Sequence, residues 1–178
     1  KMALAAMEAG VHGLRLNPGN IRKPEHIKAV AAEAKGRGIP IRIGVNGGSL
    51  EKTLLEKHGG VTAQAMVESA CRHIDILEDL GFDLIKVSLK SSQVPLMIAA
   101  YRRLADLIPY PLHLGVTEAG LYEYGSIKSA IGSGTLLAEG IGDTIRVSLT
   151  GDPGREIDAA KLILRALGLR KEGVEVIS

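Results

Sequence analysis

The chain has 178 residues, enough for one domain with a hydrophobic core, and its net charge of +2 gives no indication of a nucleic-acid or membrane partner. Its single cysteine, Cys71, excludes an internal disulfide and any all-cysteine metal or iron–sulfur site within the chain. Aromatic residues make up only 3% of the chain, too few for the stacking surfaces that bind single-stranded nucleic acid, and no apolar run is long enough to cross a bilayer.

Short β-branched segments alternate with longer segments of helical pattern. We predict strands at residues 13–17, 41–46, 84–90, 112–117 and 144–149, with 174–177 as a candidate sixth, and helices at 24–37, 62–80, 94–107, 126–139 and 153–167. Glycines that end helices precede several strands, at Gly10, Gly38, Gly81 and Gly168, and Thr62 and Asp152 are suited to cap helix N-termini. Strand–helix–strand order with short connections predicts a parallel α/β sheet, in which residues 46–61 form the one long connection.

The two ends of the chain lie inside patterned segments. Residues 1–10 already have a helical pattern without an initiator Met, and residues 174–178 end in an apolar run. We therefore expect both ends to be cut rather than natural. No signal peptide is visible, and the single cysteine is consistent with a cytoplasmic protein.

All five predicted strands have one aliphatic face and one polar face, because side chains alternate between the two faces of a strand. The polar positions are Arg15, Asn17, Arg42, Gly44, Asn46, Lys86, Ser88, Lys90, His113, Gly115, Thr117, Arg146 and Ser148. Parallel strands that are covered by helices on both faces are normally apolar throughout. A polar face on every strand therefore favours a barrel, whose helices pack outside, over a doubly wound sheet. A solvated antiparallel sheet would also alternate, but the intervening helices argue against it.

Five of the polar positions are cationic, namely Arg15, Arg42, Lys86, Lys90 and Arg146. Active sites of barrels lie at the carboxyl ends of the strands, where Asn17, Asn46, Lys90, Thr117 and Ser148 fall. Converging guanidinium, ammonium and amide groups are suited to binding phosphate. The alternative is that each cation pairs with a carboxylate, but no Asp or Glu occupies the polar face of these strands. The pattern therefore predicts a site for an external anion.

Glu118 follows Thr117 at the end of the fourth predicted strand, and a lone carboxylate at a cationic barrel mouth is a candidate general acid or base. A structural role at the start of a helix or in a salt bridge explains its position equally well. His113 lies deeper on the polar face and is interpreted as an interior histidine. Cys71 and His73 are two residues apart on a predicted helix and point to different sides, which argues against a metal pair.

Six segments, taken in chain order, together resemble the 4-hydroxy-3-methylbut-2-enyl diphosphate synthase family (IspG/GcpE), the iron–sulfur enzymes of the non-mevalonate isoprenoid pathway. The segments are LRLNPGN (14–20), PIRIGVNGGSL (40–50), KVSLK (86–90), LHLGVTEAG (112–120), SAIGSG (129–134) and GIGDTIRVSL (140–149). The resemblance implies a (β/α)8 TIM barrel followed by a smaller domain with a 4Fe–4S cluster. Residues 1–178 would then be a single partial TIM-barrel domain of about five consecutive βα units, corresponding to strands 4 to 8, and the cluster cysteines would be absent from this chain.

The resemblance also implies an activity and roles for particular residues. The family converts 2-C-methyl-D-erythritol 2,4-cyclodiphosphate to 4-hydroxy-3-methylbut-2-enyl diphosphate, and ferredoxin or flavodoxin supplies two electrons through the cluster. Glu118 would be the acid or base near the departing hydroxyl, and no metal ligand is expected in this chain. Matched by motif, the substrate diphosphate would be held by Arg15, Arg42, Asn46, Lys90, Arg146 and Ser148, with Asn17 beside them.

The resemblance has consequences for assembly. Enzymes of the family are homodimers in which the cluster of one subunit caps the barrel of its partner, and they reside in the bacterial cytoplasm or the plastid stroma. A chain without cluster ligands is expected to be inactive alone, and the two edges of an open five-stranded sheet favour self-association. The alternative function is a non-catalytic partial barrel that binds a phosphorylated metabolite.

Overall fold

The computed structural model describes residues 2–17 and 24–171, so the candidate strand at 174–177 lies outside the described residues. In chain order the elements are α1 (Met2–Glu8), β1 (Leu14–Leu16), α2 (Pro24–Arg37), β2 (Ile41–Asn46), η2 (Gly47–Ser49), α3 (Lys52–His58), α4 (Ala63–Asp79), β3 (Ile85–Lys90), α5 (Val94–Ala105), β4 (His113–Leu114), α6 (Tyr122–Ala138), β5 (Thr144–Ile145) and α7 (Pro153–Ala166). Strands and helices alternate as predicted, and the long connection contains η2 and α3. No helix within the described residues is long and apolar enough to span a membrane.

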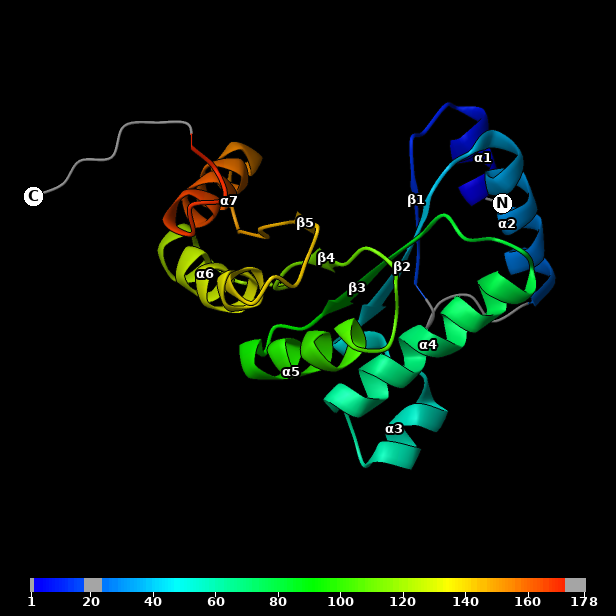
Figure 1. Cartoon of the computed structure of the whole chain (residues 1–178), viewed down its shortest axis with the longest axis horizontal. Coiled ribbons are helices and arrows are strands. Elements are labelled where there is room, and N and C mark those ends of the chain that lie inside the picture. The colour runs from blue at the N-terminus through cyan, green and yellow to red at the C-terminus, as the bar shows by residue number, and fades with distance from the viewer. Residues whose placement is uncertain (1, 18–23, 172–178) are drawn as a thin grey trace, which may run out of the picture.

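The strands are parallel and neighbour one another in chain order, which confirms the predicted parallel α/β arrangement. β1, β2 and β3 form one sheet, β4 and β5 form a second, and a bridge between Val87 and Leu112 links the two. Figure 1 shows the strands following one another from the α1–α2 end of the molecule to the α6–α7 end. Consecutive βα units thus build one continuous parallel layer, as expected of part of a barrel.

Local signals predicted from the sequence explain where several elements begin and end. The Thr62 side chain accepts a hydrogen bond from the Ala65 N–H at 3.1 Å, and the Asp152 side chain accepts one from the Gly154 N–H at 2.8 Å. Both predicted N-caps are therefore confirmed. Gly81, which follows α4, has a φ of +67°, a left-handed conformation in which a glycine ends a helix without strain.

The junction between β3 and β4 is built around the Tyr101 hydroxyl, which α5 supplies to the core. The Val87 N–H bonds to the Pro111 carbonyl, so the next pair in a regular parallel ladder would be the Leu89 N–H and the His113 carbonyl. Instead the Tyr101 hydroxyl accepts from the Leu89 N–H at 2.9 Å and donates to the His113 carbonyl at 2.6 Å. The phenol therefore separates the strands and satisfies both groups, which explains why the layer is divided into two sheets.

β4 and β5 are each two residues long, shorter than the strands predicted at 112–117 and 144–149. The backbone pairing continues irregularly, because the Arg146 N–H bonds to the Leu114 carbonyl at 2.9 Å. Tyr101 keeps β4 away from β3, and β5 has a described neighbour on one side only. Helix α6 begins at Tyr122 instead of residue 126, and Gly125 lies within it, where an added Cβ would be 2.5 Å from Leu149 Cδ2.

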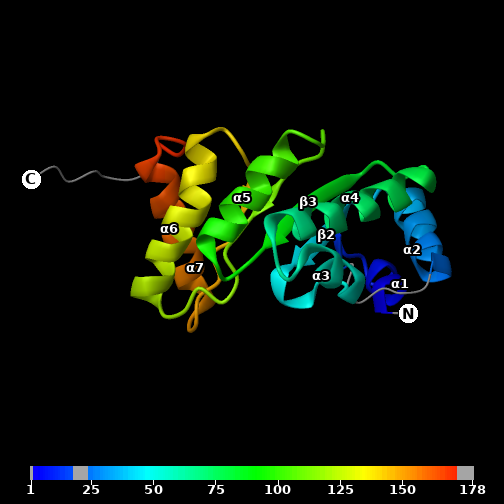
Figure 2. The same ribbon diagram turned by 90° about the horizontal axis from the view of Figure 1, so that it is seen from below.

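The aliphatic face of the strands carries the core, as the alternation predicted. Ile41, Ile43 and Val45 of β2 are at most 2% exposed, and Val87 and Leu89 of β3 are fully buried. Helix α4 packs on both of these strands and α5 packs on β3, and Figure 2 shows the two helices covering this side. Removal of this aliphatic surface from water is the dominant favourable term in folding.

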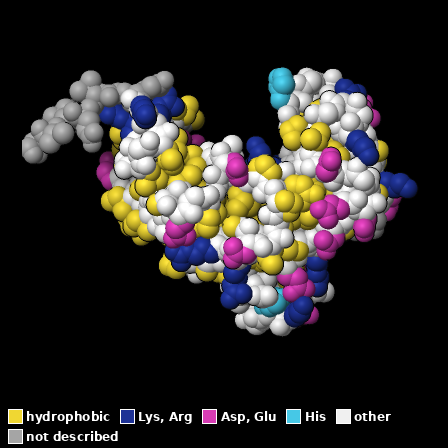
Figure 3. Space-filling model, in the orientation of Figure 1, with side chains coloured by type: hydrophobic (Ala, Val, Ile, Leu, Met, Phe, Trp, Pro, Cys, Tyr) yellow, Lys and Arg dark blue, Asp and Glu magenta, His cyan; other side chains and the backbone are white. Residues whose placement is uncertain are grey.

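The polar face of the strands is left open. Figure 3 shows a hollow between the α1–α2 end and the α6–α7 end of the molecule, on the side opposite α4 and α5. On the polar face of the strands Arg15 is exposed, and Arg42 and Lys86 are half-buried. The open layer therefore has the two unlike faces of a barrel wall, one apolar and covered, the other polar and accessible.

Tyr101→Phe would remove the hydroxyl that bridges β3 and β4. We expect the free energy of unfolding to fall by about 1–3 kcal/mol, because a buried N–H and a buried carbonyl lose their partner. Urea denaturation followed by circular dichroism measures this change. Tyr124→Phe on α6, where the side chain is 66% exposed, is the matched control and should leave stability unchanged. Equal stability of Tyr101→Phe and the unmodified chain would contradict the bridging role.

Candidate functional site

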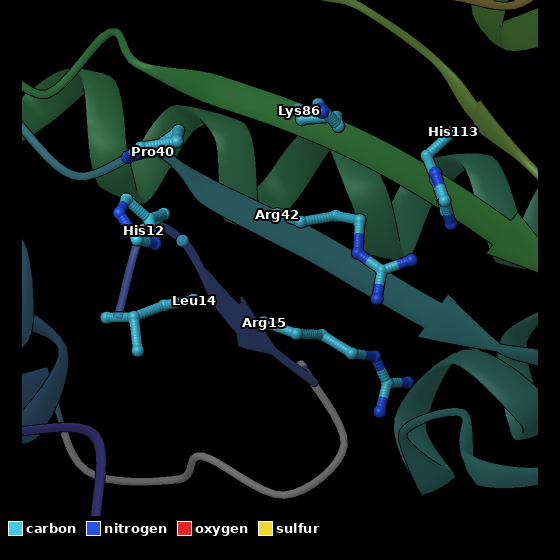
Figure 4. Close-up of a pocket in the computed structure, with 8 residues that line it drawn as sticks. His12, Leu14, Arg15, Pro40, Arg42, Lys86 and His113 are labelled. Atoms are coloured by element: carbon cyan, nitrogen blue, oxygen red, sulfur yellow. The ribbon is translucent and has the colours of Figure 1, made fainter. Parts of the chain in front are cut away.

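The polar face carries a row of cations from neighbouring strands. The strand register aligns Arg15 with Arg42 and Arg42 with Lys86. In Figure 4 the guanidinium groups of Arg15 and Arg42 lie further along the strands than the residues' own backbone, toward the carboxyl ends. Like charges directly opposite each other on adjacent strands repel. The aligned cations therefore repel one another, and a bound anion would reduce this electrostatic repulsion.

A cavity of about 300 Å3 lies beside these cations, toward the amino-terminal ends of the strands (Figure 4). It is lined by His12, Gly13, Leu14, Arg15, Pro40, Arg42, Lys86 and His113. Burial, followed by the nearby Arg42, lowers the pKa of His113 to about 3, so this ring is neutral near pH 7. Its Nδ1 lies 2.8 Å from the Thr144 hydroxyl. A half-buried, neutral and hydrogen-bonded ring fits the interior role predicted for His113.

Arg42 has an unsatisfied donor at the centre of the row. Its Nη1 is buried and has no hydrogen-bond partner among the described residues. Burial, followed by Arg15, lowers the pKa of Arg42. A buried polar group without a partner costs about 1–3 kcal/mol, and more when the group is charged. An anion that accepts from Nη1 would remove this cost and part of the repulsion.

Lys90, at the carboxyl end of β3, is the buried cation of the site and is only 8% exposed. Its pKa is lowered to about 8 by burial, then by Arg42 and Arg146, while Glu156 opposes the shift. The carboxylate of Glu156 itself accepts a hydrogen bond from the Leu149 N–H at 2.9 Å. The lowered pKa of Lys90 therefore reflects burial first, and then the positive charge that surrounds it.

Several surface cations pair with carboxylates, whereas in the part of the chain that the structure describes the cations of the row do not. Lys57 and Arg72 contact Glu68, and Arg102 contacts Glu139. Within residues 2–17 and 24–171, no carboxylate oxygen lies within 4.0 Å of a side-chain nitrogen of any row cation, namely Arg15, Arg42, Lys86, Lys90 and Arg146. The alternative in which each cation has its own carboxylate is therefore excluded for this part of the chain.

A second cavity, of about 210 Å3, lies at the carboxyl ends of β2 and β3. Asn46, Ser91, Thr117 and Glu118 are among its lining residues. Glu118 is exposed and has a φ of +51°, a left-handed conformation that is strained for a side chain of this kind. Strained residues of this type cluster at functional sites. The structure thus brings Glu118 and Asn46, two of the predicted site residues, to one cavity.

The remaining predicted site residues are placed at the same edge of the strands. Asn17 donates from its side-chain amide to the Ser49 hydroxyl at 3.2 Å, and that hydroxyl donates to the Asn46 carbonyl at 3.4 Å. Arg146 is exposed beyond β5 and contributes to the lowered pKa of Lys90. Ser148 is half-buried in the same segment, and none of the described hydrogen bonds involves its side chain.

Lys86, one of the five cations of the predicted anion site but not among those matched by motif to the diphosphate, lines the larger cavity. Sequence reasoning gave no site role to three further residues that the structure places here. His113 lines the same cavity. Gly44 and Gly115 lie directly beneath the Arg15 and Lys90 side chains. In the sequence, these residues could have been identified only by their positions on the polar face of the strands. A glycine at such a position leaves room for the side chain of a neighbouring cation.

The 4Fe–4S cluster implied by the resemblance does not fit the residues of this chain. Cys71 is the sole cysteine, and it lies half-buried on α4, where burial raises the pKa of its thiol. In the described ranges, no group of three or more His, Cys, Asp or Glu side chains is arranged to hold a metal ion. No chemical step is therefore assigned to a cluster within this chain.

The fold and the row of cations define a class of protein, a parallel α/β domain built like the wall of a barrel, with a cationic inner face. Family comparison makes the class specific. The chain belongs to the family described as the GcpE TIM-barrel domain, which matches residues 1–161. This confirms the resemblance predicted from the sequence motifs.

Curated relatives cover the whole chain. Those of Caldanaerobacter subterraneus subsp. tengcongensis and Ruminiclostridium cellulolyticum are 61% and 59% identical over 178 residues, and each is named 4-hydroxy-3-methylbut-2-en-1-yl diphosphate synthase (flavodoxin). Both are covered for 50% of their own length, so the chain spans about half the length of these relatives. A solved structure is also similar, that of YagE, a prophage protein of the dihydrodipicolinic acid synthase family from E. coli K12. The match covers 94% of this chain and 68% of the YagE chain, with 16% sequence identity and a TM-score of 0.42. This similarity is too distant to support an argument.

Lys90 should titrate near pH 8, and Arg42→Ala should raise its pKa toward the ordinary lysine value, because Arg42 is the strongest repelling charge. NMR of 13C-labelled lysine side chains measures both titrations. Arg102→Ala, which removes a surface arginine of α5, is the control and should not move the Lys90 resonance. An unchanged Lys90 pKa in Arg42→Ala would show that the two cations do not interact.

Proposed function

We propose that this chain is the substrate-binding part of the catalytic barrel of a 4-hydroxy-3-methylbut-2-en-1-yl diphosphate synthase, a single partial domain spanning residues 1–178. Its five strands would be strands 4 to 8 of a (β/α)8 barrel. The family match, the names of the relatives and the chain-order parallel strands support this proposal. The complete enzyme would convert 2-C-methyl-D-erythritol 2,4-cyclodiphosphate to 4-hydroxy-3-methylbut-2-enyl diphosphate.

The main support for the proposal is that the cations on the inner face have no carboxylate partner among the described residues. Arg42 has a buried donor without a described partner, and Lys90 has a pKa lowered to about 8. Both features are unfavourable in the unliganded chain, and both would be relieved by a multiply charged anion. A diphosphate supplies several acceptor oxygens and more than one negative charge, so it suits this face better than a carboxylate does.

Each site residue has a distinct part in this proposal. Arg15, Arg42 and Arg146 would donate paired hydrogen bonds to phosphate oxygens, and Lys90 would contribute a compact charge. Asn46 and Ser148 would donate further hydrogen bonds, and Asn17 would orient the Asn46 segment through Ser49. This arrangement would fix the diphosphate at the strand ends and leave the carbon chain of the substrate near the second cavity.

Glu118 would hold or deliver the proton at the departing hydroxyl. Support comes from its place in the second cavity, which Asn46 also lines, and from its left-handed backbone, a conformation that clusters at functional sites. Protonation of a leaving hydroxyl converts it to water, which is a far better leaving group.

Electrons would reach the substrate from outside this chain. The relatives' names give flavodoxin as the reductant, and ferredoxin is the other candidate donor. A 4Fe–4S cluster would be held by cysteines that this chain does not contain, within a homodimer that brings the cluster over the barrel. We place the enzyme in the bacterial cytoplasm, with the plastid stroma as the alternative. The chain alone would bind substrate without reducing it.

A non-catalytic partial barrel is the second candidate function. It is favoured by the presence of the cations in a chain that carries one cysteine and no described metal site. The reading frame that encodes the chain distinguishes the two candidates: three further cysteines downstream, two of them in a Cys-x-x-Cys pair, support the synthase, and their absence contradicts it.

Arg42→Ala should weaken binding of inorganic pyrophosphate and of the cyclodiphosphate by about 10- to 100-fold, because hydrogen bonds to charged groups contribute about 1.5–3 kcal/mol. Calorimetric titration of the full chain measures the dissociation constants. Arg103→Ala removes an exposed arginine of α5 and should bind like the unmodified chain. Equal affinity of Arg42→Ala and the unmodified chain would refute the diphosphate assignment.

Glu118→Gln should leave cyclodiphosphate binding intact and lower turnover by about 10²- to 10⁴-fold, the usual contribution of a general acid or base. The measurement needs the complete enzyme with its cluster and a reduced flavodoxin. Glu56→Gln on α3, where the side chain is exposed, is the matched control. Unchanged turnover of Glu118→Gln would return Glu118 to a structural role.

A further inference from the structure

Gly44 of β2 lies directly beneath the Arg15 side chain. A Cβ built on Gly44 would be 2.4 Å from Arg15 Nε, and its three nearest atoms would all belong to the Arg15 side chain. The Arg15 Nη2 also donates a hydrogen bond to the Gly44 carbonyl at 3.1 Å. Arg15 therefore lies across the next strand, and the hydrogen bond to the Gly44 carbonyl holds its guanidinium group there.

The backbone itself does not require a glycine at position 44. Gly44 is in the middle of β2 and is not among the residues of positive φ. Alanine is compatible with a strand conformation, and glycine in a strand interior is the less stable choice. What the glycine provides is the space that the Arg15 side chain occupies.

The same arrangement recurs one strand pair further along the layer. A Cβ on Gly115, just beyond β4, would lie 3.3 Å from Lys90 Nζ and 2.8 Å from the Arg146 carbonyl oxygen. Gly115 also has no positive φ. In both cases a cation of one strand lies across a glycine of the following strand, on the polar face. At Gly115, however, the nearest atom is the backbone carbonyl oxygen of Arg146, so the close approach of the segment after β5 already requires a glycine there, and of the two glycines only Gly44 has a cation side chain as its sole close neighbour.

We propose that Gly44 is a positioning residue of the anion site, which acts by letting Arg15 lie against the sheet. A side chain at position 44 would lift the Arg15 guanidinium into the hollow and break its bond to the Gly44 carbonyl. The flexible end of an arginine can make this shift at little cost to the fold. Anion affinity would fall without a loss of stability. The inference rests on the proposed diphosphate site.

The experiment compares pyrophosphate binding by the full chain and four variants: Gly44→Ala, Arg15→Ala, the double variant, and Gly36→Ala as control. Gly36 lies in α2, where an added Cβ would contact nothing within 4 Å. Gly44→Ala should bind about 10-fold or more weakly, because misplacing a binding group by an ångström has effects of this size or larger. The double variant should bind no more weakly than Arg15→Ala, since Gly44 acts through Arg15. Thermal melting of Gly44→Ala should be no lower than that of the unmodified chain.

The outcomes separate this inference from the proposed function. If the unmodified chain binds pyrophosphate but Gly44→Ala binds equally well, or its loss simply adds to that of Arg15→Ala, the positioning role is overturned and the diphosphate site stands. If the unmodified chain does not bind pyrophosphate, the proposed function fails. The 15Nε–1Hε resonance of Arg15 then decides the inference: a displaced resonance in Gly44→Ala supports the positioning role, and an unmoved one overturns it.

Discussion

The repulsion between like charges on one face of a parallel layer is the constraint on which this structure depends. Arg15, Arg42 and Lys86 are aligned by the strand register, and Lys90 and Arg146 extend the row to the strand ends. Within the described residues, no carboxylate pairs with them. The lowered pKa of Lys90 and the unsatisfied donor of Arg42 are the local signs of this imbalance. A charge arrangement that disfavours the empty state is well suited to hold a multiply charged anion.

The opposite face of the same strands provides the stability that offsets the repulsion among the cations. Its aliphatic side chains are buried beneath α4 and α5, and that burial offsets the electrostatic cost. The Tyr101 hydroxyl then sets the spacing between β3 and β4 by joining the Leu89 N–H to the His113 carbonyl. This junction fixes where the second pair of strands presents its polar face. The same strands therefore provide both the packed aliphatic face and the charged polar face.

Sequence reasoning predicted the elements that depend on local pattern. The alternation of side chains along the strands gave the parallel layer, its covered and open faces, and the cations that line the open one. It could not predict the division between β3 and β4, because that depends on a tyrosine hydroxyl of α5, the connecting helix, which replaces the direct hydrogen bond between the two strands. Nor did it assign a role to Gly44, since the contact with Arg15 arises only when β1 and β2 pair. The left-handed backbone of Glu118 was likewise invisible in the sequence, where no glycine or asparagine marks it.

The most direct test of the anion site is the pKa of Lys90, measured by NMR with and without saturating pyrophosphate. A bound diphosphate adds negative charge beside a lysine whose pKa is lowered to about 8 by burial and neighbouring cations. The anion stabilises the protonated form, so the Lys90 pKa should rise toward the ordinary lysine value and pyrophosphate affinity should fall as the pH increases through 8. A Lys90 pKa that stays near 8 at saturating pyrophosphate would show that the anion binds elsewhere, and the inner face would then not be the diphosphate site.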